Sequence, residues 1–217
     1  MTDARQGGLF DDPAADIELG PGARLLKGFA LAESRNLLAQ IAKIEADAPF
    51  RHLTTPGGHV MSVAMTNAGR AGWVSDRRGY RYEAADPLSG QPWPAMPPLF
   101  ADLARRAAAA LDFDGFDPDA CLVNRYAPGS RLTLHQDQDE KDMRQPIVSV
   151  SLGLPATFLW GHETRGGRLR RLPLIHGDVV VWGGPSRMIF HGVDTLKDGE
   201  HPLTGRLRYN LTFRSAL

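Results

Sequence analysis

The sequence predicts a mainly β fold with flanking helices, on three observations. From residue 120 onward, eight short strand-like runs follow one another, and turn signals such as APGS, HGD and GGPS separate most of them. Before that point, two segments have helical rather than strand periodicity. The length of 217 residues suits one domain that buries enough surface for a core. Short strands at this spacing predict a closed or sandwiched antiparallel barrel.

Two helices are expected in the first half of the chain. The first covers residues 33–48, because leucines and isoleucines share one helical face there and Pro49 ends the helix. The second runs from Pro97 or Pro98 to Leu111, with a proline at its start. Between them, a strand is expected over residues 59–67. Residues 68–98 carry tryptophans and tyrosines among glycines and prolines, and are either an ordered functional loop system or an irregular cover over a sheet.

The composition limits the class of protein. Lysine and arginine total 25 and aspartate and glutamate total 25, so no global field attracts nucleic acid and any such contact needs a local patch. The single cysteine, Cys121, can form no internal disulfide. The N-terminus lacks the apolar core of a signal peptide, and no stretch reaches the roughly 18 apolar residues of a membrane helix. We expect a cytoplasmic monomer with no membrane association and no obligate protein partner.

Three residues predict a metal centre. His135 and Asp137 stand two positions apart after a strand-like run, so in a strand both side chains point to the same face. His191, at the end of another strand predicted over residues 187–193, can supply a third ligand. Two imidazoles and one carboxylate leave coordination positions open, as in non-haem iron(II) oxygenases. On this pattern alone, a zinc site and the absence of any metal, with Asp137 as a turn residue, stay open as alternatives.

Two polar strand faces predict a carboxylate-binding wall. The C-terminal strand, residues 208–214, alternates strictly, and its polar face would be costly to bury unless negative charges compensate for its two arginines. A bound dicarboxylate would supply those charges, while a solvated outward face explains the pattern equally well. In VNRY, Asn124 and Tyr126 also share a face, either beside a bound carboxylate or on an ordinary polar strand. The polar residues of the C-terminal strand are Arg208, Asn210, Thr212 and Arg214.

Nearly the whole chain, from about Leu25 to Phe213, resembles the AlkB family of iron(II)- and 2-oxoglutarate-dependent oxygenases. The resemblance rests on the motifs NRYAPG, LHQDQDE, HGDVVVWGG and RYNLTFR, which occur in the family's order. It implies a double-stranded β-helix (jelly-roll) core with an N-terminal nucleotide-recognition lid. We therefore divide the chain into a loose lead-in at residues 1–20, helices and lid at 21–119, and a jelly-roll catalytic core at 120–217.

The resemblance also implies the cofactor and the cosubstrates, which are Fe(II), 2-oxoglutarate and O2. The iron ligands that it implies are His135, Asp137 and His191. The 2-oxoglutarate contacts that it implies are Asn124, Tyr126, Arg208, Asn210 and Arg214. Of these, Arg208 would pair with the distal carboxylate.

For the substrate, the resemblance implies contacts from Trp73 and Tyr80 in the lid, and from Asp139 facing the methylated base. Arg165 matches a substrate-contacting arginine, although its neighbourhood, WGHETRGG, departs from the family pattern. Trp160 occupies a position where the family has phenylalanine. These departures concern the shape of the pocket and its preference among bases.

The implied reaction is oxidative demethylation of alkylated bases of the N1-methyladenine and N3-methylcytosine class, which is direct-reversal DNA repair. 2-Oxoglutarate is oxidised to succinate and carbon dioxide, and the methyl group is hydroxylated and lost as formaldehyde. Alkylated single- or double-stranded DNA is the implied substrate, with RNA as a further candidate. One alternative is the same iron chemistry on tRNA or protein. From another class, the alternatives are a zinc hydrolase and a non-catalytic β-sandwich binding module.

Overall fold

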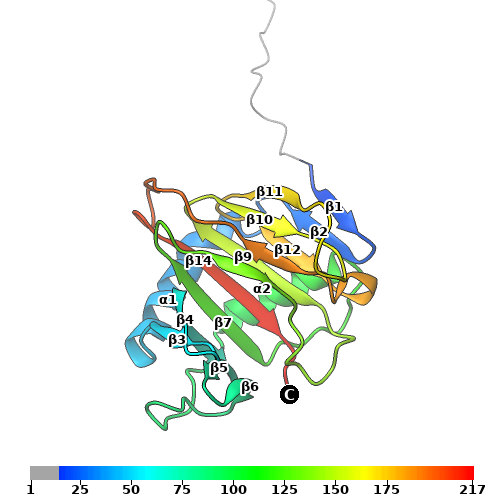
Figure 1. Ribbon diagram of the computed structural model, residues 1–217. Helices are drawn as coiled ribbons and strands as arrows, with labels where there is room; N and C mark the ends of the chain where they lie inside the picture. The colour runs from blue at the N-terminus through cyan, green and yellow to red at the C-terminus, as the bar shows by residue number, and fades with distance from the viewer. Residues whose placement is uncertain (1–14) are drawn as a thin grey trace, which may run out of the picture.

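The computed structural model describes residues 15–217, and the remainder of the predicted lead-in, residues 1–14, lies outside the described residues. Two antiparallel sheets form the jelly roll that the resemblance implied, and a hairpin and two helices accompany them (Figure 1). In spatial order, the large sheet contains β1 (Ile17–Gly20), β2 (Ala23–Leu26), β12 (Val179–Trp182), β9 (Ile147–Gly153), β14 (Arg208–Arg214), β7 (Ala120–Tyr126), β4 (Val60–Gly69) and β3 (Arg51–Thr54). The small sheet contains β11 (Arg170–Leu174), β10 (Ala156–Trp160), β13 (His191–Val193) and β8 (Leu132–His135). The other elements are the hairpin of β5 (Gly72–Asp76) and β6 (Gly79–Glu83), the helices α1 (Ser34–Asp47) and α2 (Pro98–Ala109), and the 3-10 turns Leu31–Glu33 and Gly184–Ser186.

Both helices cover one face of the large sheet, behind β9, β14 and β7 in Figure 1. α1 turns Leu37, Ile41 and Ile44 inward at the spacing of one helical face. α2 begins at Pro98, where a missing backbone N–H costs no helical hydrogen bond. Apolar residues of both helices join those of the sheet in one core cluster, which confirms the two predicted helices. No helix within residues 15–217 is long and apolar enough to cross a membrane.

β14 lies in the middle of the large sheet, paired with β7 on one side and β9 on the other. Its register places Arg208 opposite Tyr126 and Asn210 opposite Asn124. The apolar face of β14 packs against the helices, and Phe213 on that face is fully buried. The polar face is buried as well, so the prediction of strict alternation is confirmed and the alternative of a solvated outward face is wrong.

The segment 68–98 is not irregular throughout, because it contains the β5–β6 hairpin. Two side chains hold this hairpin at the edge of the large sheet. The amide of Asn67 exchanges hydrogen bonds of 3.0 Å with the backbone N–H and C=O of Trp73. The hydroxyl of Ser75 donates to the carbonyl of Thr54 at 2.7 Å. A lone hairpin is only marginally stable, so these anchors fix its position on the molecule.

Three details differ from the sequence-based expectations. Residues 17–20, expected in the loose lead-in, form β1 and pair with β2, so the predicted lead-in is wrong there. The strand expected over residues 187–193 begins only at His191, because a 3-10 turn precedes it. The large sheet takes strands from both sides of residue 120, so the expected boundary does not separate two structural units. The jelly roll therefore begins with the N-terminal strands.

Candidate active site

A cavity of about 900 Å³ opens between the two sheets and beneath the hairpin. Its walls come from strands of both sheets, from β5–β6 and from the segment that follows β8. All the site residues predicted from the sequence line this one cavity. Its volume lies within the range of small-molecule sites, roughly 300–1,000 Å³. The predicted metal ligands and the polar residues of β7 and β14 therefore line the same cavity.

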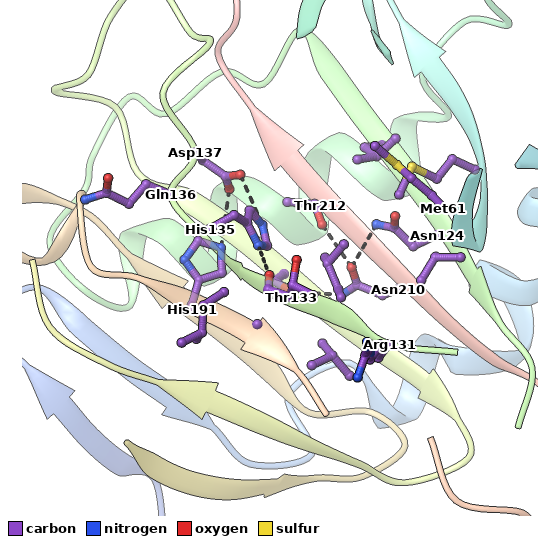
Figure 2. Close-up of a pocket in the computed structure, with 18 of the residues that line it drawn as sticks. Met61, Asn124, Arg131, Thr133, His135, Gln136, Asp137, His191, Asn210 and Thr212 are labelled. Carbon is purple, nitrogen blue, oxygen red and sulfur yellow. Dashed lines mark hydrogen bonds and ion pairs between the residues drawn. The ribbon is translucent and has the colours of Figure 1, made fainter. Parts of the chain in front are cut away.

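His135, Asp137 and His191 meet at the floor of the cavity (Figure 2). His135 ends β8 and His191 begins β13, and the two are register partners in the small sheet. Asp137 follows β8, and its two carboxylate oxygens lie 3.7 Å from the Nε2 atoms of the two histidines. One ligand atom from each residue lies within 4.8 Å of the others, which suits a single ion bound by all three. We call these three residues the metal-ligand cluster.

Backbone carbonyls orient both imidazole rings. His135 Nδ1 lies 2.8 Å from the carbonyl oxygen of Thr133, and His191 Nδ1 lies 2.9 Å from that of Ile189. A donating Nδ1–H leaves Nε2 with the lone pair that a metal ion needs. Burial, together with the neighbouring His135, lowers the pKa of His191 to about 4, so this ring is neutral at neutral pH. The cluster is thus prepared for a cation.

Asp137 is a buried anion, 8% exposed. Burial by itself would raise the pKa of its carboxyl, but Arg214 and the two histidines outweigh burial and hold that pKa well below its usual range. Arg214 Nη2 lies 2.9 Å from Asp137 Oδ2 and forms an ion pair with it. Asp137 is therefore a charged residue of the cavity floor, and its reading as a turn residue of an acidic surface stretch is wrong.

The close approach of β8 and β13 beside the cluster depends on Gly192. A Cβ at this position would lie 2.7 Å from the carbonyl oxygen of Leu132, far inside van der Waals contact. The register of the two strands also shifts between His191 and Val193. Strand irregularities of this kind re-aim side chains next to active sites. The glycine therefore allows the two histidines to face each other.

Arg208 is the most deeply buried charge of the cavity, at 1% exposure. Its Nη2 donates to Ser151 Oγ at 3.0 Å, and its guanidinium lies over the ring of Tyr126, 4.8 Å from the centroid. Within residues 15–217, its Nε and Nη1 have no hydrogen-bond partner. Burial lowers the pKa of Arg208 although Tyr126 opposes that change. A buried cation with two free donors fits a carboxylate ligand, which would satisfy both.

A network of amides from β7 and β14, Asn124 and Asn210, lies in the same cavity as the metal-ligand cluster (Figure 2). Asn210 Nδ2 donates to Ser149 Oγ at 2.8 Å and to the carbonyl of Val150 at 3.0 Å. Asn210 Oδ1 accepts from Asn124 Nδ2 at 3.2 Å and from the Thr212 hydroxyl at 2.9 Å. These bonds fix both amides before any ligand binds. Asn124 Oδ1 is the exception, because this buried acceptor has no hydrogen-bond partner within residues 15–217.

Aromatic and acidic side chains form the rim of the cavity. The rings of Trp73 and Tyr80 stack with centroids 5.5 Å apart and an interplanar angle of 13°. Trp73 Nε1 donates to Asp139 Oδ2 at 2.7 Å, so the indole and the carboxylate hold each other in place. Tyr80 is 47% exposed, so its ring is accessible at the mouth of the cavity. A flat platform beside a carboxylate suits a planar cation.

The two positions that depart from the family pattern have different surroundings. Arg165 lies at the rim, where its Nη2 donates to the carbonyl of Leu134 at 3.2 Å and its guanidinium lies 5.2 Å from the ring of Phe190. Trp160 does not line the cavity: it is 3% exposed, and its Nε1 donates to the carbonyl of Leu19 in β1 at 3.2 Å. The larger ring at position 160 therefore alters the packing behind the cavity rather than its wall.

Sequence reasoning missed three polar residues behind the metal-ligand cluster. Glu140 pairs with Arg187 at 2.9 Å and accepts a hydrogen bond of 2.6 Å from the hydroxyl of Tyr82. Glu140 stands in the acidic stretch DQDEKD, where nothing in the pattern distinguishes a buried acid from its exposed neighbours. Arg187 stands at the head of a run that was expected to be a strand. Only the three-dimensional structure brings them together.

A jelly roll that holds two imidazoles and a carboxylate beside a buried cationic strand face defines a non-haem iron oxygenase with an acidic cosubstrate. The chain belongs to the 2OG-Fe(II) oxygenase superfamily, whose family model matches residues 22–214. It is therefore an Fe(II)- and 2-oxoglutarate-dependent dioxygenase, and O2 is its other cosubstrate. The alternatives of a zinc hydrolase and of a non-catalytic binding module are excluded.

Relatives of known identity extend over almost the whole chain. The chain is 54% identical over 209 residues to the alpha-ketoglutarate-dependent dioxygenase AlkB of Salmonella typhimurium, covering 96% of this chain and 97% of the relative. It is 56% identical over 198 residues to the protein of the same name from Escherichia coli K12, covering 91% and 92%. The solved structure of OsALKBH1 matches with a TM-score of 0.80 and 31% identity, covering 92% and 99%. The similarity therefore includes both sheets and both helices.

Proposed function

We propose that this dioxygenase removes methyl groups from alkylated nucleic-acid bases of the N1-methyladenine and N3-methylcytosine class, and so repairs DNA by direct reversal. One observation carries the proposal: the cavity has a stacked aromatic pair with a carboxylate at its rim and the metal-ligand cluster at its floor. A base methylated at these positions is flat, cationic and unable to pair. It therefore leaves the helix at a lower cost than a normal base and suits such a rim.

In this proposal, His135, Asp137 and His191 hold iron(II). When bound, the iron supplies, with 2-oxoglutarate and O2, the oxidising power that an inert N-methyl group requires. The contribution of the chain is to direct both imidazoles by their Nε2 atoms, which the carbonyls of Thr133 and Ile189 support, and to keep the buried His191 neutral. Three protein ligands leave coordination positions for the cosubstrate.

2-Oxoglutarate would lie along the polar face of β14. Arg208 would bind its distal carboxylate, since two of the guanidinium nitrogens are free and no counter-charge lies nearby within the described residues. Tyr126 lies beneath that guanidinium and would contact the same end of the cosubstrate. The other end would lie among Asn124, Asn210 and Arg214, next to the metal-ligand cluster.

The β5–β6 hairpin would serve as the nucleotide-recognition lid. A flipped base would stack on Trp73, with the ring of His135 opposite, which is worth about 1–3 kcal/mol per base. The carboxylate of Asp139 would favour a cationic base over a neutral one. Tyr80 and Arg165 are exposed at the rim, where they would contact the phosphate backbone without reading sequence.

The names of more distant relatives support nucleic-acid bases as substrates. A relative from Arabidopsis thaliana, 44% identical over 110 residues, is named a DNA N(6)-methyladenine demethylase. A relative from Schizosaccharomyces pombe, 32% identical over 137 residues, is named a tRNA demethylase. We therefore propose single- or double-stranded DNA as the main substrate and RNA, including tRNA, as the second candidate.

A product-resolved assay tests this function. The enzyme is supplied with Fe(II) and 2-oxoglutarate, and with N1-methyladenine or N3-methylcytosine in single-stranded DNA, double-stranded DNA, RNA and tRNA. We expect release of formaldehyde and restoration of the base, fastest on DNA. Turnover of 2-oxoglutarate without loss of methyl groups from any of these substrates would refute the proposal. Faster repair of tRNA than of DNA would favour the second candidate.

We also propose that the enzyme acts as a cytoplasmic monomer without an obligate partner. One chain supplies all the contacts named above, so the reaction needs no residue from a second subunit. Size-exclusion chromatography with light scattering should give the mass of one 23.7 kDa chain in the active fraction. Activity confined to a larger species would contradict this.

A further inference from the structure

Behind the metal-ligand cluster lies a buried ion pair that the proposed function does not use. Glu140 and Arg187 are 7% and 3% exposed, and Arg187 Nη2 lies 2.9 Å from Glu140 Oε2. A buried ion pair repays its desolvation only when further hydrogen bonds satisfy both partners. Such bonds are present, and they lead in two directions: to the metal-ligand cluster and to the β5–β6 hairpin.

The first direction leads to Asp137. Arg187 Nη1 donates to the backbone carbonyl of Asp137 at 2.6 Å, and its Nε donates to that of Gln145 at 3.0 Å. Arg214 lies between the two carboxylates: its Nη2 is 2.9 Å from Asp137 Oδ2, and its Nε is 3.2 Å from Glu140 Oε1. Both contacts are ion pairs without hydrogen-bond geometry, since neither Asp137 Oδ2 nor Arg214 Nε has a hydrogen-bond partner within residues 15–217. Glu140 therefore faces the same guanidinium that stabilises Asp137.

The second direction leads to the hairpin. The hydroxyl of Tyr82 donates to Glu140 Oε1 at 2.6 Å, and Tyr82 is the cross-strand partner of Trp73. Trp73 in turn donates to Asp139. Two consecutive acids thus each accept one hydrogen bond from the two strands of the hairpin. Burial raises the pKa of Tyr82 well above its ordinary value, although Arg214 opposes this, so the hydroxyl keeps its proton and donates.

We propose that Glu140 is a positioning residue for the demethylation reaction, whose carboxylate holds the β5–β6 hairpin and Arg214 in one arrangement. The inference rests on the proposed function and deepens it, because it connects the base-stacking side of the cavity to its 2-oxoglutarate side. Glu140 Oε1 faces both Tyr82 and Arg214, so one carboxylate oxygen contacts the hairpin and the guanidinium. The neighbouring Asp139 contacts the hairpin, but no arginine of residues 15–217 pairs with it, which makes it the matched control.

Hydrogen–deuterium exchange of the hairpin backbone, residues 72–83, tests whether Glu140 holds the hairpin. The measurement uses metal-free protein without nucleic acid. Tyr82→Phe removes only a hydroxyl, and we expect these amides to exchange about tenfold faster, because a hydrogen bond to a carboxylate is lost. Glu140→Gln keeps a neutral acceptor, whose bond is about half as strong. In that background Tyr82→Phe should therefore accelerate exchange only about threefold. In an Asp139→Asn background, Tyr82→Phe should still accelerate hairpin exchange about tenfold.

Steady-state kinetics test whether Glu140 also holds Arg214. Glu140→Gln should raise the KM for 2-oxoglutarate about tenfold, because Arg214 loses a charged neighbour that holds its orientation. Tyr82→Phe should raise the KM for a methylated oligonucleotide and leave the KM for 2-oxoglutarate within about twofold. The two variants therefore separate the two contacts of one carboxylate.

Two results would overturn the proposal. Unchanged hairpin exchange in Tyr82→Phe would mean that the hydrogen bond from Tyr82 to Glu140 does not stabilise the hairpin. Equal acceleration in α1 (Ser34–Asp47) and in the hairpin of Glu140→Gln, with an unchanged KM for 2-oxoglutarate, would mean general destabilisation. Because the exchange measurement needs neither metal nor nucleic acid, it can be made even if the enzyme turns over no methylated base. That outcome would refute the proposed function and leave the contacts of Glu140 intact.

Discussion

The floor and the rim of the cavity are built by opposite means. The floor consists of the metal-ligand cluster and the polar face of β14, and the rim consists of the hairpin aromatics with Asp139 and Arg165. On the floor Arg208 is 1% exposed, whereas on the rim Tyr80 is 47% exposed. Floor residues stand on or next to strands paired within two sheets, while the rim depends on a two-stranded hairpin and loops. The metal-ligand cluster is thus placed on rigid elements, and the base recognition that we propose on an element held by few side chains.

This contrast is sharpest at the metal ligands, where we expect the largest effect. Asp137→Ala should abolish measurable turnover on every substrate, since even residues that only orient metal ligands are worth about 10–100-fold. Formaldehyde release and anaerobic Fe(II) titration measure activity and metal binding. Asp198→Ala, at an exposed aspartate, is the control and should behave as the unmodified enzyme. Near-normal iron affinity in Asp137→Ala would remove this residue from the metal site.

The buried floor should also make stability depend on pH. In the metal-free fold the pKa of His191 is about 4, against an ordinary value of 6.5, so the unfolded chain binds the proton first. The contribution of neutral His191 to the free energy of unfolding is complete above about pH 6.5. It is lost as the pH falls to about 4, an effect on the order of 3 kcal/mol. Urea denaturation at several pH values measures it. His191→Asn should flatten this part of the profile, and a profile as steep as that of the unmodified protein would contradict the assignment.

Next in size is the carboxylate-binding end of the floor. Arg208→Met should raise the KM for 2-oxoglutarate about 30-fold or more, because a buried charge-assisted contact is lost. Without 2-oxoglutarate the variant should unfold at no lower urea concentration, since a buried cation without a carboxylate partner in the described chain is removed. The exposed neighbour Arg206 provides the control, Arg206→Met. An unchanged KM in Arg208→Met would place the dicarboxylate elsewhere.

At the rim, the effects should concern the substrate alone. Asp139→Asn should reduce the preference for cationic over neutral methylated bases about tenfold in kcat/KM, because the carboxylate charge is lost while the shape is kept. The KM for 2-oxoglutarate should not change. Competition between the two kinds of base in one reaction measures the preference directly. Equal discrimination in the variant would assign that role to another residue.

The smallest effect is expected at Arg165. Arg165→Ala should raise the KM for a methylated oligonucleotide about threefold, as expected for one exposed charge, and added salt should diminish the difference. A loss of 2-oxoglutarate binding in this variant would break the separation between floor and rim.

The sequence predicted the floor far better than the region behind it. The alternation of β14 and the spacing of His135 and Asp137 follow from strand geometry, so Arg208 and the metal-ligand cluster could be located from local pattern and family motifs. The hairpin was not predicted as strands, because residues 72–83 lie in a segment rich in aromatics and glycine. Glu140 was missed for another reason: its burial results from Arg187, 47 positions later, and no local pattern records such a pairing.

The first strand, β1, supports the small sheet that carries two of the metal ligands. The carbonyl of Leu19 in β1 receives hydrogen bonds from the indole of Trp160 and from Arg170, both in the small sheet. Trp160 is also the register partner of His191. We expect a truncation or fusion that removes or displaces β1 (Ile17–Gly20) to loosen β10, and with it the neighbouring strand β13 that carries His191. The integrity of β1 should therefore affect metal loading, although this strand lies outside the cavity.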